Sequence, residues 1–368
     1  MREKRITNLD GIRGIAVLAV IAFHYIHNQT MYDSWLINRF GTPASLLIKV
    51  AYFGWSGVDL FFILSGFLIG NILLKNKDSK SLFKTFYIRR FFRIIPVYYL
   101  LVAIFFLLTL TPLYDPKASF FFDPIPLTAF LLMIQNFYMA HYNHFGPLPL
   151  TPTWSLCIEE QFYLIIPFLI FLINRKYAWI LAVAGIIIAI VARGTASNYY
   201  SGYVLLTSRL DSPMMGFLLA WLHQYQSFRD WISKKLVWVA GLLIIMAILC
   251  WRFYAEPHPG ILGHTLVGFT FALVVILAIY SKNILLGNML SNAFLIEMGK
   301  LSYFIYLYHQ FVNGLLHLVF LKQRNPILDS YAAIGLTVIS FVITYLLAAL
   351  SFKFIEKPAI NYSHRFRY

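Results

Sequence analysis

Long apolar segments separated by short polar links are the feature that most limits how this chain can fold. Of its 368 residues, 60% are hydrophobic and only 12% are charged. An apolar helix of about 20 residues is long enough to cross a hydrocarbon core about 30 Å thick. The chain is therefore predicted to be an all-α, polytopic transmembrane helix bundle, and a water-soluble fold is excluded.

Ten segments have the length and hydropathy of membrane spans. They are residues 9–29, 53–74, 89–110, 153–173, 177–194, 205–224, 236–253, 262–281, 296–320 and 331–354. A shorter apolar piece, residues 127–139, has the length of a re-entrant or interfacial segment rather than of a full span. No repeat or long linker interrupts the series, so residues 1–368 are expected to form one integral-membrane domain.

The positions of the basic residues orient these spans, because cytoplasmic loops carry an excess of Lys and Arg. If the short piece does not span, four basic segments lie on the same side as Arg2, Lys4 and Arg5: residues 75–84, 175–176, 229–235 and 353–367. Lys322 and Arg324 fall on the other side and are the exception. We predict ten spans with both termini cytoplasmic, and this topology explains the net charge of +15 without a nucleic-acid partner.

Two ionisable residues in the first span, Arg13 and His24, are eleven positions apart. At about 100° per residue they lie on one stripe of a helix, roughly 16 Å apart along its axis. Ionisable side chains inside a span are costly and are candidates for a functional site. The structural alternative is that His24 packs as a hydrogen-bonded core residue and that Arg13 extends its guanidinium to the lipid headgroups.

Three arginines, Arg89, Arg90 and Arg93, begin the span 89–110 at the predicted cytoplasmic surface. Guanidinium groups bind phosphate through two parallel hydrogen bonds and stay charged when partly buried, so the cluster is a candidate phosphate clamp. Alternatively, the arginines anchor the helix to anionic lipid. Pro96 follows within the span and is expected to kink it.

The span 153–173 carries two consecutive carboxylates, Glu159 and Glu160, near its predicted extracytoplasmic start. At least one is expected to face a polar interior, where a carboxylate suits acid–base chemistry, because both are improbable in contact with lipid. Trp154 and Ser155 precede them, and Ser155 shares a helix face with Glu159. The alternative is an assembly role, in which a carboxylate pairs with an arginine such as Arg209.

A polar stripe, Ser302, Tyr306, His309 and Asn313, runs through the apolar span 296–320. The stripe either lines a cavity or forms hydrogen bonds across a helix interface, and a lone histidine such as His309 is more often a hydrogen-bonded core residue than a catalyst.

Other residues of the spans are expected to be structural. Gly66 and Gly70 give a close-packing face to the span 53–74. Cys157 and Cys250 lie in apolar surroundings and predict no disulfide framework.

Six segments, taken in order, carry a family resemblance. They are LDGIRGIAVLAVIAFH (9–24), GVDLFFILSGFLIG (57–70), YIRRFFRIIPVYY (87–99), TPTWSLCIEEQFYLIIP (151–167), GKLSYFIYLYH (299–309) and FIEKP (354–358). With these segments the chain resembles acyltransferase family 3, membrane enzymes of bacteria that O-acylate sugars and other acceptors. The resemblance extends from residue 6 to about residue 360.

The resemblance implies a protein of the bacterial cytoplasmic (inner) membrane that transfers an acyl group, most often acetyl, from acyl-CoA to a glycan, lipid-linked glycan or small-molecule acceptor. It implies that Arg13 and His24 are required and that the arginines of residues 89–93 serve the cytoplasmic acyl-CoA. It also implies that Glu159 is the acidic residue of the Trp-Ser-Leu-x-x-Glu motif. Family members often carry a soluble esterase-like extension. None is expected within residues 1–368, so an extracytoplasmic partner would be a separate protein.

The expected mechanism is acyl transfer from a thioester to a hydroxyl. His24 would act as general base or carry the acyl group transiently, and Glu159 or Glu160 would fix its tautomer. Tyr306, Ser302 and Trp154 are candidate oxyanion donors. Neither a metal nor nucleic acid is expected.

Two other functions are compatible with the polar residues. A proton-coupled transporter would show two matched halves, and no such repeat is visible. A non-catalytic subunit of an envelope assembly would be expected to lack His24 or Arg13, and the chain has both.

Overall fold

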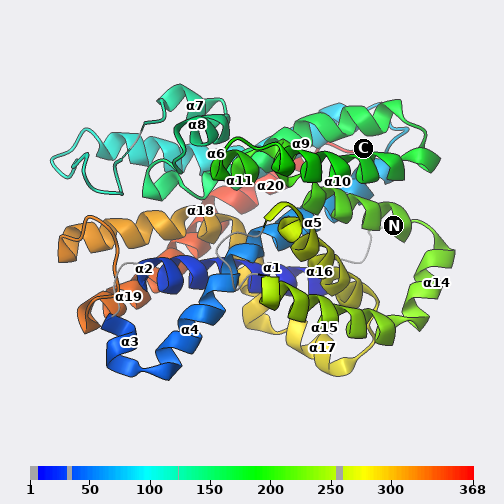
Figure 1. Cartoon of the computed structure of the whole chain (residues 1–368). Coiled ribbons are helices and arrows are strands. Elements are labelled where there is room, and N and C mark those ends of the chain that lie inside the picture. The colour runs from blue at the N-terminus through cyan, green and yellow to red at the C-terminus, as the bar shows by residue number, and fades with distance from the viewer. Residues whose placement is uncertain (1–6, 31–34, 123, 254–259) are drawn as a thin grey trace. The chain divides into compact units, whose positions relative to one another are not determined.

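The computed structural model describes residues 7–30, 35–122, 124–253 and 260–368, and all regular secondary structure in these ranges is helical (Figure 1). The N-terminal basic residues Arg2, Lys4 and Arg5, which contributed to the predicted orientation, lie outside the described residues. The chain divides into two compact units. Unit 1 contains Met1–Ala16, Val58–Ser79 and Ile158–Lys300, and unit 2 contains Val17–Gly57, Lys80–Cys157 and Leu301–Tyr368.

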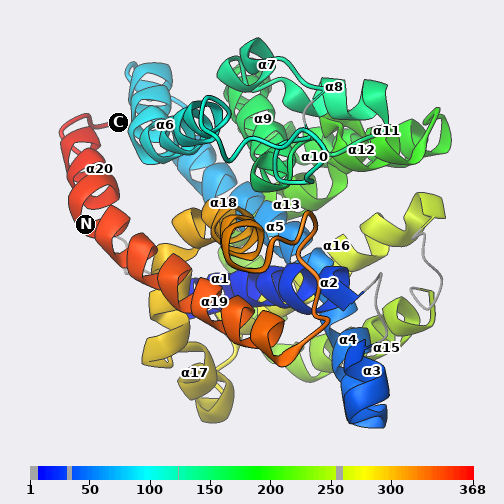
Figure 2. The same ribbon diagram turned by 90° about the vertical axis from the view of Figure 1, so that its left-hand side faces the viewer.

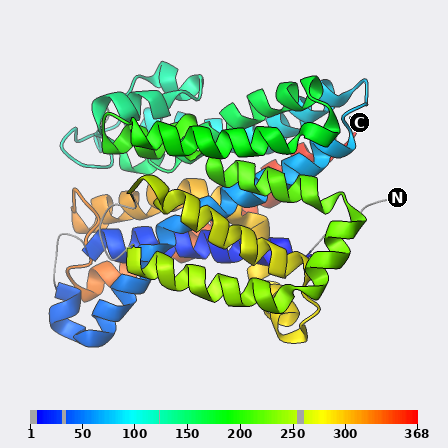
Figure 3. The same cartoon turned by 45° about the vertical axis from the view of Figure 1, so that its right-hand side comes forward.

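Three long helices contribute residues to both units. They are α1 (Thr7–Ala22), α9 (Thr153–Leu172) and α18 (Ala293–Leu321). The other helices of unit 1 are α5 (Gly57–Lys75), η4 (Arg175–Tyr177), α10 (Trp179–Gly194), α11 (Tyr199–Val204), α12 (Leu206–Arg209), α13 (Asp211–His223), α14 (Gln226–Lys234), α15 (Leu236–Phe253), α16 (Gly260–Tyr280) and α17 (Ile284–Leu290). Helices α10, α13 and α16 pack against one another, and α15 runs beside α16 (Figure 3).

Glycines bring α5 and α13 into direct backbone contact. A Cβ atom at Gly66 would overlap the carbonyl oxygen of Pro213, and one at Gly216 would overlap that of Ile63. At Gly70 it would lie 2.8 Å from the Cβ of Ala220. The prediction that Gly66 and Gly70 form a close-packing face is therefore confirmed, because no larger residue fits there without separating the helices.

A buried ionic network lies where the chain passes from α12 to α13. The Arg209 guanidinium donates to both carboxylate oxygens of Asp59 at 2.9 Å, and Arg193 lies 2.8 Å from Asp211. His264 contacts Arg209, and both side chains of the Arg209–Asp59 pair are fully buried. Two positive and two negative charges thus compensate one another, as burial in an apolar interior requires.

The described residues contain eight helices long and apolar enough to cross a membrane, or nine if α14 and α15 form one bent span. The expected span 205–224 is not among them. It is divided into α12 and α13, and α13 has only 13 residues, too few to cross a hydrocarbon core. The charged residues Arg209 and Asp211 explain the difference, since they belong to the ionic network. The span 53–74 also begins earlier than expected, within an apolar helical segment Thr42–Lys75.

The other helices of unit 2 are η1 (Phe23–His27), α2 (Asn28–Thr30), α3 (Trp35–Phe40), α4 (Thr42–Tyr52), η2 (Phe53–Ser56), α6 (Leu82–Leu108), α7 (Leu127–Leu131), α8 (Gln135–Tyr142), η3 (Leu148–Leu150), α19 (Tyr331–Ser351), η5 (Phe352–Glu356) and α20 (Lys357–Ser363). Helix α6 runs unbroken through Pro96. Two tyrosines donate to carbonyls on either side of this proline, Tyr303 to Ile94 at 2.7 Å and Tyr308 to Val97 at 3.1 Å. Helix α20 packs against α6 (Figure 2).

The short apolar piece 127–139 forms no candidate span. It is divided between α7 and α8 at Met133, whose φ of 54° breaks the helix. The chain before and after this piece lies at one end of unit 2, because the Leu148 amide donates to the Ser119 carbonyl at 2.9 Å. This agrees with leaving the piece out of the span count.

Candidate active site

His24 lies on a single π-helical turn, η1, which directly follows α1 within the first apolar helix. Such turns inside α-helices are frequent at functional sites. The Nδ1 atom of the partly buried His24 is 3.0 Å from the Val20 carbonyl oxygen and 3.0 Å from Nε2 of His309. The centroids of the two imidazole rings are 4.9 Å apart. A second histidine is therefore the immediate neighbour of His24.

The hydrogen bonds of His309 determine which nitrogen of His24 carries a proton. His309 Nδ1 lies 2.7 Å from the Tyr306 carbonyl oxygen and 3.2 Å from that of Ile305, and carbonyl oxygens only accept. His309 must therefore donate from Nδ1, which leaves its Nε2 as an acceptor. Nδ1 of His24 faces this acceptor and the Val20 carbonyl, so it carries the proton. Nε2 of a neutral His24 then holds the lone pair that a base or nucleophile needs.

Tyr25 connects the π-helical turn to α18. Its buried phenol donates to the His309 carbonyl at 2.8 Å. Two contacts thus hold the imidazoles together. One is their own hydrogen bond, and the other is the bond from Tyr25, the residue after His24, to the backbone of His309. Sequence reasoning missed Tyr25 and the pairing of His24 with His309, because nothing in the sequence links the two segments.

Four further predicted residues of unit 2 lie on α9 and α18, where Trp154, Ser155 and Ser302 are buried and Tyr306 is partly buried. The Ser155 hydroxyl donates to the Pro152 carbonyl at 3.1 Å and is 2.7 Å from the Tyr306 phenol. Tyr306 therefore donates to Ser155. Trp154 and Ser302 are 5% and 8% exposed, which leaves both side chains within the protein interior. The structure thus brings Tyr306 and Ser155 together, with His309 one turn further along α18.

Arg13, Glu159 and Glu160 belong to unit 1. Arg13 lies 3.6 Å from Asp10, one turn away on α1. Glu159 accepts a 3.0 Å hydrogen bond from the Tyr163 phenol, and Glu160 is partly buried. Since His24 belongs to unit 2, a carboxylate–imidazole pair remains a prediction.

The sequence suggested an ion pair of Glu159 or Glu160 with Arg209, and the structure gives Arg209 a different partner. Arg209 forms its ion pair with Asp59, an acidic residue of the span 53–74 to which the sequence assigned no partner.

The three arginines of α6 differ in their surroundings. Arg89 donates from Nε and Nη2 to the Phe366 carbonyl at 3.1 and 2.7 Å, and its guanidinium lies 4.9 Å from the centre of the Tyr368 ring. The Arg90 guanidinium lies 5.8 Å from the Phe86 ring, and Arg93 is exposed. Arg89 thus holds the C-terminal segment, and phosphate binding by the three arginines remains a prediction.

A family model described as "Acyltransferase domain" matches residues 6–351. The chain belongs to acyltransferase family 3. The match covers both units and includes all twelve predicted site residues, whose individual roles it does not assign.

Among relatives in Staphylococcus aureus, the chain is 28% identical to "Putative O-acetyltransferase SACOL0978" of strain COL, over 97% of the chain and 58% of that protein. It is 26% identical to "O-acetyltransferase OatA" of strain NCTC 8325 / PS 47, over 95% of the chain and 56% of that protein. The chain thus spans little more than half the length of these family members. No solved structure gives a significant match.

Proposed function

We propose that the chain is a membrane-embedded O-acyltransferase that moves an acyl group, acetyl in the first instance, from cytoplasmic acyl-CoA to a hydroxyl of an envelope glycan or related acceptor. Membership of acyltransferase family 3 and the names of the relatives support this class of reaction. The observation that carries the proposal is the paired imidazoles, because their hydrogen bonds leave Nε2 of His24 unprotonated.

In the proposed step, Nε2 of His24 takes the proton of the acceptor hydroxyl while the hydroxyl oxygen bonds to the carbonyl carbon of the thioester. The carbon–sulfur bond then breaks, and the leaving thiolate takes the proton back from His24 as the free CoA thiol. The imidazole returns to its neutral form. His309 accepts from Nδ1 throughout and stabilises the cation that forms transiently on His24.

Other residues serve the donor and the acceptor in this proposal. Arg90 and Arg93 bind the CoA phosphates, and Arg13 lies along the path of the donor. Tyr306 supplies a phenol to the oxyanion by exchanging its bond to Ser155. No step of the proposed reaction is assigned to the secondary candidates Ser302, Trp154 and Glu160. Glu159 contributes a negative charge to the site.

The buried side chain of Asn313, one turn beyond His309, is a candidate to bind the hydroxyl of the acceptor. Its Oδ1 atom has no hydrogen-bond partner among the described residues.

The proposal also includes the orientation. In a bacterial cytoplasmic membrane, an orientation with both termini inside would place the acyl-CoA arginines and His24 at opposite levels of the bilayer. An acceptor carried by a separate extracytoplasmic partner then reaches His24 from the outer side.

Replacing His24 with Gln tests the proposed function. Membranes containing the variant should transfer label from acetyl-CoA at least roughly a hundredfold more slowly than wild type, which is the usual contribution of a general base. His27→Gln is the matched control, because His27 lies on the same π-helical turn and stacks on Phe23. Wild-type transfer by a well-folded His24→Gln protein would refute the role. Mass spectrometry of surface glycans from a deletion strain and its parent would identify the acceptor.

A further inference from the structure

Helix α14 lies at the edge of unit 1 at a steep angle to its neighbour. The segments Gln226–Lys234 and Leu236–Trp251 are bent by 72° at Lys235. Helix α15 has 18 mostly apolar residues, the lower end of the length of a membrane crossing. A helix at this angle to a crossing lies near the plane of the membrane surface. Helix α14 also has one buried apolar side, where Ile232 is only 4% exposed. It therefore has the form of an interfacial helix.

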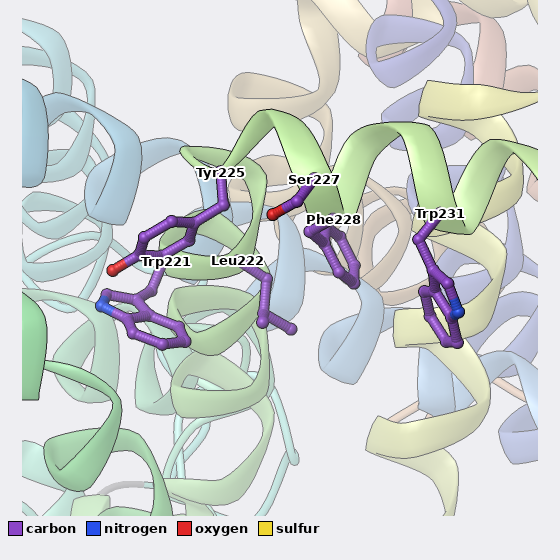
Figure 4. Close-up of a pocket in the computed structure, with 6 residues that line it drawn as sticks. All are labelled: Trp221, Leu222, Tyr225, Ser227, Phe228 and Trp231. Carbon is purple, nitrogen blue, oxygen red and sulfur yellow. The ribbon is translucent and has the colours of Figure 1, made fainter.

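An open pocket of about 460 Å³ lies between the end of α13 and α14. It is lined by Trp221, Leu222, Tyr225, Ser227, Phe228 and Trp231 (Figure 4). Figure 4 shows Phe228 and Trp231 projecting from the same side of α14, with Trp221 and Tyr225 beside one another at the other end of the pocket. Trp231 is 56% exposed and Tyr225 41% exposed, so the apolar lining is accessible. Its volume and its aromatic lining suit a hydrocarbon chain.

Positive charge continues the same face of the helix. Lys234 is exposed and lies three positions after Trp231, so it follows Trp231 along one side of α14, and the exposed Lys235 comes directly after the helix. At the other end, the Trp221 indole donates to the carbonyl of Arg175 at 2.9 Å, next to the exposed Lys176.

The other charges near the pocket have protein partners. Arg175 forms a 3.0 Å salt bridge with Asp78. Arg229 donates to the His223 carbonyl at 2.8 Å, and Asp230 accepts from Gln226 at 2.7 Å. Arg229 and Asp230 carry opposite charges, and Arg175 is paired with Asp78, so the lysines determine the sign of the net charge presented to a ligand.

We propose that this pocket binds an anionic phospholipid of the leaflet in which α14 lies. An acyl chain packs against Trp231, Phe228 and Trp221, and the phosphodiester lies by Lys234 and Lys235. Lysines near a membrane surface attract anionic lipid, while the aromatic lining alone would accept any lipid. The inference is independent of the acyl-transfer proposal, since it uses no residue of that site.

Quenching of Trp231 fluorescence by brominated lipids tests the proposal. The purified full chain is placed in phosphatidylcholine bilayers that contain either brominated phosphatidylglycerol or the same fraction of brominated phosphatidylcholine. The Trp231 signal is obtained by subtracting the Trp231→Phe variant. Brominated phosphatidylglycerol should quench it roughly threefold or more above brominated phosphatidylcholine, because the anionic lipid is enriched beside the lysines.

The charge-reversal variant Lys234→Glu/Lys235→Glu should lose this preference while keeping quenching by both lipids. Lys353→Glu/Lys357→Glu, which changes the net charge equally at two exposed lysines of unit 2, should keep it. Equal quenching by the two lipids in the wild type, or a preference that survives charge reversal of α14, overturns the proposed phospholipid site. Absence of quenching by either lipid also overturns it and indicates that protein covers the pocket.

Discussion

The pairing of His24 with His309 decides what the first of these residues can do. A neutral histidine has one donor and one acceptor nitrogen, and its chemistry depends on which one faces the reactant. Here two backbone carbonyls direct the proton of His309, and His309 with the Val20 carbonyl directs that of His24. His309 is therefore a positioning residue in the proposed reaction.

Substitution of His309 should separate this role from packing. His309→Leu removes the acceptor for His24 Nδ1 and should lower kcat about tenfold, equivalent to ~1.4 kcal/mol or one hydrogen bond. His309→Gln retains a side-chain oxygen that accepts, so it should recover part of the rate. KM for acetyl-CoA should stay constant in both variants. Equal kcat values for the two substitutions would show that His309 only fills space.

Of the arginines of α6, Arg90 is expected to bind acyl-CoA and Arg89 to hold the C-terminal segment. Arg90→Ala is expected to raise KM for acyl-CoA about tenfold, the loss of one charge-assisted hydrogen bond of ~1.4 kcal/mol. Arg90→Lys should restore it only in part, because lysine lacks the planar guanidinium. Arg89→Ala should instead loosen the segment around Phe366, detected as faster proteolysis of the C-terminal residues. Unchanged acyl-CoA kinetics in both Arg90 variants would assign Arg90 to lipid anchoring.

At the scale of helices, α5 and α13 illustrate how a membrane protein joins its elements. Small residues bring the two backbones together, and the Asp59–Arg209 pair adds a connection in an interior where hydrophobic attraction between helices is weak. Because both side chains are buried, water cannot solvate either charge if its partner is removed. The two residues therefore stabilise the fold only as a pair.

Removal of one charge from this pair should therefore destabilise unit 1. Asp59→Asn leaves the buried Arg209 guanidinium without its counter-charge and is expected to cost about 3–5 kcal/mol. Thermal unfolding in detergent would detect the loss as a lower Tm. Asp78→Asn is the control, because its salt bridge with Arg175 is exposed and such pairs contribute little. An equal Tm for Asp59→Asn and wild type would contradict a stabilising role for the pair.

At the scale of the whole chain, contacts within each unit join some of the basic loops to one another. In unit 2 the Ser81 hydroxyl donates to the Arg367 carbonyl at 2.9 Å, which joins two basic segments. In unit 1 the salt bridge of Arg175 with Asp78 joins the basic segment 175–176 to the segment 75–84.

The basic loop that did not fit the predicted cytoplasmic side contains an arginine with an acidic partner. Arg324, predicted to lie outside, is 3.0 Å from Asp115. The Lys117 amide and the Arg324 guanidinium hold the pKa of Asp115 below its ordinary value, which favours its ionised carboxylate.

Cysteine labelling in intact cells would test the topology. Cysteines at Lys117 and Tyr142 should react with an impermeant thiol reagent, while one at Lys80 should not; all three positions are exposed. Tyr142 is preferred to Asn143, whose φ of 54° disfavours a cysteine. Cys157 and Cys250 are buried and should contribute little background. Reaction at Lys117 with protection at Tyr142 would make residues 127–139 a true span and reverse the orientation of everything after it.

The sequence by itself determined the all-helical membrane fold, the family, the glycine contact face and the polar positions worth testing. These follow from composition, helical period and short motifs, which depend on neighbours along the chain. Only the tertiary structure decided that His309 faces His24, that Arg209 pairs with Asp59 and that Arg89 holds the C-terminal segment. It also broke the segment 205–224 into two helices and placed a π-helical turn at His24. The physical reason is common to all of these: each depends on contacts between residues distant in sequence, or on a local backbone irregularity, and a helical period carries neither.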